Sequence, residues 1–206
     1  PDDASCKAII ENIRNAKKNK DTVGGLCETH VFGCPPGLGS CTSWQEKLDS
    51  KLAGAVMGIQ AFKAVEIGLG STCGKLQGSE VHDPIIFDKE KRDSCHFGFT
   101  RSTNHAGGIE GGMSNGMPIV VRGTMKPIAT LLQGMDSVDL QTGESSRSDY
   151  ERSDVCALPA ASVVMENAIG FEIAAVFLTS FGGATMEMVR ASHDAFANAA
   201  RKITPS

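Results

Sequence analysis

A glycine-rich segment is the first feature of the sequence that could hold a ligand. Residues 104–116 read NHAGGIEGGMSNG, and their five glycines let backbone amides approach a ligand closely and adopt positive φ angles. Such a segment can cradle a phosphate or border a planar ring. It is not G-x-G-x-x-G, and it lacks the Gly-Lys-Ser/Thr ending of a P-loop, so the known nucleotide fingerprints do not fit. A glycine-rich segment alone is more often a tight turn, so its neighbours must decide its role.

Two segments further along the sequence combine charge with groups that suit an anion. Residues 126–130 read KPIAT, which places a lysine beside a rigid turn and a hydroxyl, a few residues after Arg122. Arg152 and Asp154 precede a predicted helix, so an arginine, a carboxylate and helix-terminal amides could converge there. The alternatives are a solvated lysine at a strand end and a helix N-cap with a surface ion pair.

Helices and strands alternate along the chain and must position these segments. Apolar residues at helical spacing predict helices over residues 5–18, 44–64, 160–180 and 185–202. Apolar runs predict strands over residues 26–32, 65–67 and 117–122. Ser5 could cap the first helix, and the polar residues 83–101 predict an exposed loop or hairpin tip. These patterns alone indicate a mixed class of helices and strands.

The composition predicts one globular unit over residues 1–206. With 206 residues and 41% hydrophobic content, the chain is long enough to bury a substantial core. A net charge of -4 gives no electrostatic footprint for nucleic acid or for an anionic membrane. Seven cysteines without a C-x-x-C pair are typical of reduced thiols rather than of a disulfide framework.

The most apolar stretch, residues 155–178, is long enough to span a membrane. Glu166, Asn167 and Glu172 interrupt it, and a spanning helix disfavours charge near its centre. We therefore expect a buried core helix there and no membrane partner. The chain begins at Pro1 without an initiating Met or a signal segment, which favours a cut or processed front end.

Three cysteines recur at seven-residue intervals and raise the question of a zinc site. Cys27, Cys34 and Cys41 have His30 between the first two. Structural zinc sites usually take ligand pairs separated by two to four residues, and two prolines intervene here. We therefore predict no bound metal.

Several motifs, in order along the chain, resemble those of one protein family. They are GIQAFKAVEIG at residues 58–68, RSTNHAGGIEGGMSNG at 101–116, MKPIAT at 125–130 and RSDVCALPAASVVMEN at 152–167. Together with PPGLGS and KLDSKLAGAVMG upstream, they resemble the second-half motifs of chorismate synthases. The resemblance implies an α+β fold, a mixed β-α-β sandwich in which helices pack between antiparallel sheets.

The resemblance implies an enzyme of the shikimate pathway, which leads to aromatic amino acids. Chorismate synthases remove phosphate and a ring proton from 5-enolpyruvylshikimate 3-phosphate, a 1,4-elimination that requires reduced FMN. NADPH is a candidate reductant of the flavin, and the oligomer of the family is a homotetramer. The compartment implied is the cytoplasm, or a plastid for a plant or algal source.

Carried over residue by residue, the resemblance places flavin contacts in four segments. They are Gln60, Ala61, Gly111, Lys126, Pro127, Ile128, Ala129, Thr130 and Arg152. Asp154 matches the family's carboxylate close to the flavin ring and is the predicted catalytic residue. Asp149 ends a similar Arg-Ser-Asp triplet, but it lacks the Cys-Ala-x-Pro that follows Asp154, so we treat it as a decoy. Asn104 and His105 are expected to shape the pocket.

The opening motifs of the family have no counterpart in these residues. The Gly-Glu-Ser-His-Gly motif, the substrate arginines, the two catalytic histidines and the arginine-serine flavin motif belong to the first half of the family's chain. We therefore expect that this chain alone does not turn over substrate. The alternative is a non-catalytic fold unit that keeps the family shape without binding flavin.

Overall fold

A three-stranded antiparallel sheet in the order β1-β7-β2 forms the centre of the computed structural model, which describes residues 2–149, 151 and 153–205. The elements in chain order are α1 (Asp3–Lys18), β1 (Gly25–Val31), α2 (Leu48–Met57), β2 (Phe62–Ile67), η1 (Gly70–Lys75), α3 (Gly78–Val81), β3 (Ile85–Phe87), η2 (Lys89–Lys91), β4 (Phe99–Arg101), β5 (Ile109–Glu110), β6 (Met113–Ser114), β7 (Ile119–Met125), β8 (Asp136–Val138), β9 (Ser145–Arg147), α4 (Leu158–Phe181) and α5 (Met186–Ile203). The central strand β7 pairs with β1 on one side and β2 on the other. Its residues Ile119, Val120 and Val121 are buried, and β-branched side chains of this kind pack well on a pleated sheet.

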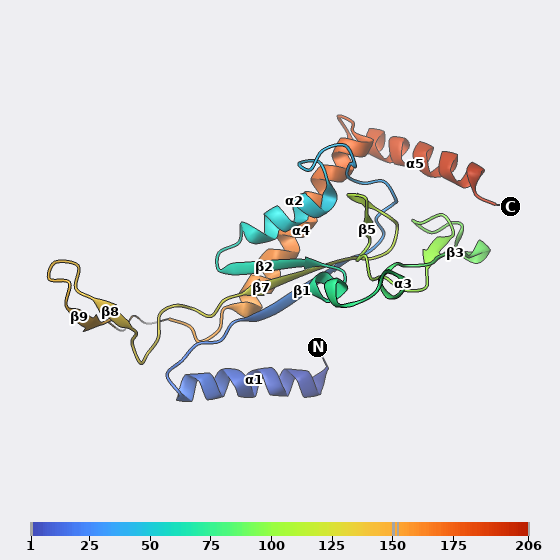
Figure 1. Cartoon of the computed structure of the whole chain (residues 1–206). Helices are drawn as coiled ribbons and strands as arrows, with labels where there is room; N and C mark the ends of the chain where they lie inside the picture. Colours follow the sequence, from blue (N-terminus) through green and yellow to red (C-terminus); the bar gives the residue numbers. More distant parts are fainter. Residues whose placement is uncertain (1, 150, 152, 206) are drawn as a thin grey trace.

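Two helices, α2 and α4, pack together and against the sheet, as Figure 1 shows. Leu48, Leu52 and Val56 of α2 are fully buried and lie four residues apart, so they form one apolar stripe along the helix. Gly123 in β7 makes room for this stripe. A Cβ at Gly123 would lie 2.9 Å from Val56 and 2.5 Å from the ring of Phe62. Close packing of the helix on the sheet therefore depends on this glycine.

Helix α4 buries one face and exposes the other. Met165 and Ile169 are fully buried in the core, whereas Val163, Leu178 and Phe171 are exposed, Phe171 by 74%. By length and composition alone α4 could cross a membrane, a test that the core helix of a soluble protein also passes. The apolar stretch therefore forms a helix as predicted, but only one face of α4 is buried in the core.

Smaller elements extend from both ends of the sheet. In Figure 1 the β8–β9 hairpin reaches away from one end, and the β3–β4 hairpin and α5 lie toward the other. Arg92, between η2 and β4, holds the end of α5. Its Nε donates a hydrogen bond to Thr204 Oγ1 at 3.0 Å, and its Nη2 donates to the carbonyl oxygen of Arg201 at 2.7 Å. A cation at the C-terminus of a helix is also favoured by the helix dipole.

Most predicted elements are confirmed, with shifted ends. The strands predicted over residues 26–32, 65–67 and 117–122 are found as β1, β2 and β7, and the polar residues 83–101 contain the β3–β4 hairpin. The two C-terminal helices are found as α4 and α5. All strand pairs in the described residues are antiparallel, so the predicted mixture of helices and antiparallel sheet is confirmed. The single unit over residues 1–206 stays a prediction.

The boundaries of two helices were predicted wrongly. The helix expected over residues 44–64 is the shorter α2, because Lys47 has an extended backbone and Ala61 has a positive φ of 69°. The first helix begins before Ser5. Asp2 is its N-cap, and the Asp2 carboxylate accepts a hydrogen bond from the Ser5 backbone N–H at 2.9 Å.

Replacing Leu52 by alanine tests the packing of α2 on the sheet. Leu52 is completely buried and its truncation leaves a cavity, so we expect the free energy of unfolding to fall by about 2–5 kcal/mol. Met57→Ala, at an exposed position of the same helix, is the matched control and should cost less than about 1 kcal/mol. Urea unfolding followed by circular dichroism measures both, and equal losses would contradict the assigned packing.

Candidate functional site

Two of the segments predicted to contact a cofactor meet at the C-terminal end of β7, together with the segment of the predicted catalytic residue Asp154. Lys126 directly follows β7, and its backbone N–H donates a hydrogen bond to the carbonyl oxygen of Ala61 at 2.9 Å. Ser153 Oγ donates a hydrogen bond to the carbonyl oxygen of Thr130 at 3.1 Å. We use the name strand-end cluster for Gln60, Ala61, Lys126, Pro127, Ile128, Ala129, Thr130, Ser153 and Asp154.

Backbone contacts hold the strand-end cluster in place. The Thr22 hydroxyl donates a hydrogen bond to the carbonyl oxygen of Ile128 at 2.6 Å, and the Val23 N–H donates to the carbonyl oxygen of Val155 at 2.9 Å. Gly24 lets the chain before β1 lie close to the end of β7, because a Cβ at Gly24 would lie 2.2 Å from the carbonyl oxygen of Met125 in β7. The segment that follows β7 is therefore anchored on the chain that leads into β1.

Polar side chains of the strand-end cluster are open to solvent. Gln60, Lys126 and Asp154 are exposed, so each can reach a ligand. Ala61 has a φ of 69°, a conformation that residues with a Cβ rarely adopt and that often occurs at ligand sites. Arg152 lies outside the described residues, and its predicted role stays a prediction.

Gly111 lies at the other end of the sheet. It sits in the turn of the β5–β6 hairpin with a φ of 61°. Its neighbour Gly112 accepts a hydrogen bond from the Leu48 N–H at 2.8 Å, which ties the hairpin to the start of α2. The Asn104 side chain donates to the Pro118 carbonyl oxygen at 2.8 Å, so the glycine-rich segment packs beside the start of β7. A seven-residue strand spans roughly 20 Å, and within this chain Gly111 and the strand-end cluster are not brought together.

A hollow of about 380 Å³ opens beside Gly111 and is lined by residues that include Asp83, His105 and Glu110. Apart from Gly111 itself and its two chain neighbours, no heavy atom of the described residues lies within 4 Å of the position that a Cβ would take at Gly111. A ligand can therefore approach the backbone of this glycine from the open side.

Asp83 organises the loop that borders this hollow. Its carboxylate is enclosed and accepts hydrogen bonds from the Thr103 hydroxyl at 2.5 Å and from the backbone N–H groups of His105 and Ala106 at 2.8 and 2.9 Å. Burial alone would raise the pKa of Asp83, but these hydrogen bonds hold that pKa below its ordinary value of 3.8. The sequence analysis missed Asp83, because its partners lie 20 to 23 residues away and no local pattern signals the contact.

Asn104 and His105 brace the glycine-rich loop. The Asn104 amide oxygen accepts a hydrogen bond from the Gly108 N–H at 2.9 Å. His105 Nδ1 lies 3.1 Å from the carbonyl oxygen of Val81. Both side chains are thus engaged with backbone around the hollow, which supports a role in shaping it.

The cysteines considered for zinc differ in their surroundings. Cys27 and Cys34 are buried, and Cys41 is exposed. Burial, with a smaller effect of Cys95, raises the pKa of the Cys34 thiol to about 11, so this thiol stays protonated at neutral pH. In the part of the chain that the structure describes, no three His, Cys, Asp or Glu side chains are grouped to hold a metal ion.

Taken together, these features define an α+β protein with an antiparallel sheet covered by helices. The sequence model of the family described as chorismate synthase matches residues 1–178. A crystal structure of chorismate synthase is similar to this chain with a TM-score of 0.78 and 36% sequence identity, covering 96% of this chain and 49% of that one. The predicted chorismate synthase-type sandwich is confirmed.

Chorismate synthases from bacteria are also similar to this chain in sequence. The chorismate synthase of Geobacillus sp. (strain WCH70) is 47% identical over 202 residues, which cover 98% of this chain and 50% of that protein. The chorismate synthase of Bacillus subtilis (strain 168) is 50% identical over 189 residues, or 92% of this chain and 47% of that protein. The chain belongs to the chorismate synthase family. It spans about half the length of these relatives and matches their C-terminal part.

Replacing Asp83 by asparagine should weaken the loop around the hollow in a pH-dependent manner. The pKa of Asp83 is lowered in the folded state, so the ionised carboxylate stabilises the fold above its ordinary pKa of 3.8, and the contribution is lost as the pH falls through the folded pKa. We expect Asp83→Asn to reduce the free energy of unfolding by about 1–3 kcal/mol at pH 7. The difference from the parent should shrink between about pH 5 and pH 3.

Urea unfolding at each pH measures this difference. Asp149→Asn, at an exposed position, is the control and should match the parent throughout. A loss in Asp83→Asn that stayed constant as the pH fell would show that the charge of Asp83 does not stabilise the loop.

Proposed function

We propose that this chain supplies the cofactor-facing half of a chorismate synthase active site. The whole protein then acts as a carbon-oxygen lyase. It catalyses the reduced-FMN-dependent 1,4-elimination of phosphate from 5-enolpyruvylshikimate 3-phosphate to give chorismate. The observation that carries the proposal is the strand-end cluster, in which two predicted flavin-contact segments from distant parts of the chain, 60–61 and 126–130, meet the segment that carries Ser153 and Asp154. Membership of the chorismate synthase family supports it.

Residue types in the strand-end cluster suit this chemistry. The Lys126 ammonium group and the Thr130 hydroxyl can donate hydrogen bonds to the anionic and carbonyl groups of a flavin. When bound, reduced FMN supplies electron density that helps the loss of a ring proton that is not acidic. Asp154 lies exposed between Ser153 and Val155, both of which are anchored by hydrogen bonds, and its carboxylate can accept or hold a proton there.

Gly111 is a second place, separate from the strand-end cluster, where this chain can contact the cofactor. Its backbone is open on one side, as a close contact with a planar ring requires. Because it lies at the far end of β7 from Lys126, a flavin that touches both must either extend along the sheet or sit between two subunits. A homotetramer of the whole protein, which we propose, would allow the second arrangement.

Substrate turnover requires more than this chain. The chain spans about half the length of its relatives. The resemblance assigns the arginines and histidines that the family uses for substrate to the other half. We propose that the whole protein works in the cytoplasm, or in a plastid for a plant or algal source, with NADPH as a candidate reductant. The net charge of -4 argues against nucleic acid or an anionic membrane as partners.

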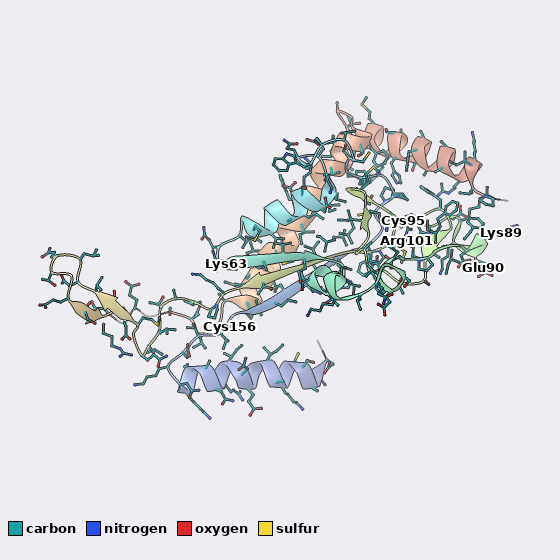
Figure 2. The ribbon with its side chains drawn as sticks, viewed as in Figure 1. Lys63, Lys89, Glu90, Cys95, Arg101 and Cys156 are labelled. Carbon is teal, nitrogen blue, oxygen red and sulfur yellow. The ribbon has the colours of Figure 1, made fainter. Side chains whose placement is uncertain are left out.

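Titration with reduced FMN under anaerobic conditions tests the strand-end cluster. We expect saturable binding that Lys126→Ala weakens about tenfold, because a charge-assisted hydrogen bond is lost. Lys89→Ala is the matched control, since Lys89 is an exposed lysine that lies far from the cluster in Figure 2, and it should leave the affinity unchanged.

If Lys126→Ala and Lys89→Ala weakened FMN binding equally, the effect of Lys126 would be a general effect of positive charge and not a specific contact with the flavin. Failure of the chain to bind flavin, both alone and after the N-terminal half of the Bacillus subtilis relative is added, would favour the alternative of a fold unit without flavin binding.

A chimera tests the role of Asp154. We expect the N-terminal half of the Bacillus subtilis relative, joined to this chain, to form chorismate, and Asp154→Asn to lower kcat about 100-fold with little change in KM. Asp149→Asn is the matched control, because it changes the same residue type in the similar Arg-Ser-Asp triplet. Chorismate formation is followed by absorbance, and equal rates for the two variants would rule out Asp154 as the catalytic carboxylate.

A further inference from the structure

His105 is anchored at one ring nitrogen and open at the other. A carbonyl oxygen can only accept a hydrogen bond, so Nδ1, which lies 3.1 Å from the carbonyl oxygen of Val81, carries the proton in this contact. Nε2 of the neutral ring is then a hydrogen-bond acceptor. Within the described residues Nε2 has no hydrogen-bond partner, yet it is not buried. The ring therefore presents an acceptor that the fold itself does not use.

The backbone of His105 is fixed as well. The Asp83 carboxylate accepts hydrogen bonds from the N–H groups of His105 and Ala106, as described above. The Leu69 N–H donates to the carbonyl oxygen of His105 at 2.9 Å, and Gly68 makes room for this contact, because a Cβ there would lie 2.1 Å from the same oxygen. Hydrogen bonds to ring and backbone thus place His105 before any ligand arrives, and a group fixed in advance loses little entropy on binding.

His105 and Gly111 line the same hollow, whose volume of about 380 Å³ is within the range of small-molecule sites. Gly111 is open on its Cβ side, so a planar ring can pack on its backbone. Ile67 and Ile109 also line the hollow and offer apolar surface to the faces of such a ring. A ligand that packs on Gly111 therefore shares this space with His105.

Charge decides which part of FMN suits this hollow. Asp49, Asp83 and Glu110 line it, whereas no lysine or arginine in the part of the chain that the structure describes does. Asp49 and Glu110 each pair with a cation outside the lining. Asp83 accepts its hydrogen bonds from uncharged groups, and its low pKa keeps it ionised at neutral pH, so it would repel a phosphate. The flavin ring, whose N–H groups donate hydrogen bonds, is the better match.

We propose that Nε2 of His105 accepts a hydrogen bond from an N–H group of the flavin ring that packs on Gly111. His105 is then a cofactor-binding residue in addition to its role in shaping the hollow. The inference rests on the proposed function, because it takes FMN as the ligand of Gly111. Two kinds of ring N–H meet this description. N3–H is present in oxidised and reduced flavin, whereas N–H groups such as N5–H are present only in reduced flavin.

Replacing His105 by asparagine isolates Nε2. The asparagine amide can still donate to the carbonyl oxygen of Val81, but its shorter side chain has no atom at the position of Nε2. We expect His105→Asn to bind reduced FMN about tenfold more weakly than the parent chain, in anaerobic titrations with the N-terminal half of the Bacillus subtilis relative present. His30→Asn is the matched control and should leave the affinity unchanged. His30 is also held at one nitrogen, by Glu28 at 2.6 Å, but it does not line the hollow.

Three ligands separate this contact from a general loss of structure. Reduced FMN, oxidised FMN and reduced 3-methyl-FMN, in which a methyl group replaces the N3 hydrogen, are each titrated against the parent chain and His105→Asn. A contact to N3–H gives a loss of affinity with both forms of FMN and none with 3-methyl-FMN. A contact to an N–H that only the reduced ring carries gives a loss with both reduced ligands and none with oxidised FMN.

An equal loss with all three ligands, or no loss with reduced FMN, would overturn the proposed contact. If His105→Asn lowers the melting temperature more than His30→Asn does, His105→Phe takes its place, because it keeps a ring without either nitrogen. If Lys126→Ala weakens FMN binding and the His105 variants do not, this contact is wrong and the proposed function stands. If the parent chain with the added half does not bind FMN, both are wrong.

Discussion

The β7 strand pairs along its length with β1 and β2, and every ladder of the central sheet includes it. Gly123, near its middle, lets Val56 of α2 and the ring of Phe62 approach the strand closely. Because β7 is hydrogen-bonded to a strand on each side and packed against α2, it holds in place the two segments that adjoin its ends. The strand-end cluster follows its last residue, and the glycine-rich hairpin packs beside its first.

This arrangement explains why the candidate site is divided. The cluster around Lys126 is held by backbone hydrogen bonds to residues before β1, while Gly111 is held through Gly112 to the start of α2. Both regions present backbone and polar groups to solvent rather than to each other. We therefore propose that a complete active site in this family needs chain or subunits beyond the half-length match.

The exposed face of α4 also favours the proposal that further chain or subunits pack on this half. In a sandwich with helices between two sheets, each helix buries two faces. Helix α4 packs one face against α2 and the sheet, and its other face carries exposed apolar side chains, Phe171 among them. A contiguous exposed apolar face is unusual for a soluble monomer. We propose that the second layer of such a sandwich packs on this surface.

The sequence by itself determined the family, the mixed fold class and most of the elements, because long motifs and the period of apolar residues are local features. It predicted β7 and α4 within a few residues, but it overextended α2, since the extended Lys47 and the left-handed Ala61 are set by packing. Only the tertiary structure decided which segments meet. The contact of Ala61 with Lys126 and the enclosure of Asp83 join residues far apart in the chain, and no local pattern encodes such contacts. The hydrogen bonds of Arg92 to Thr204 and Arg201 at the end of α5 likewise join residues more than 100 positions apart.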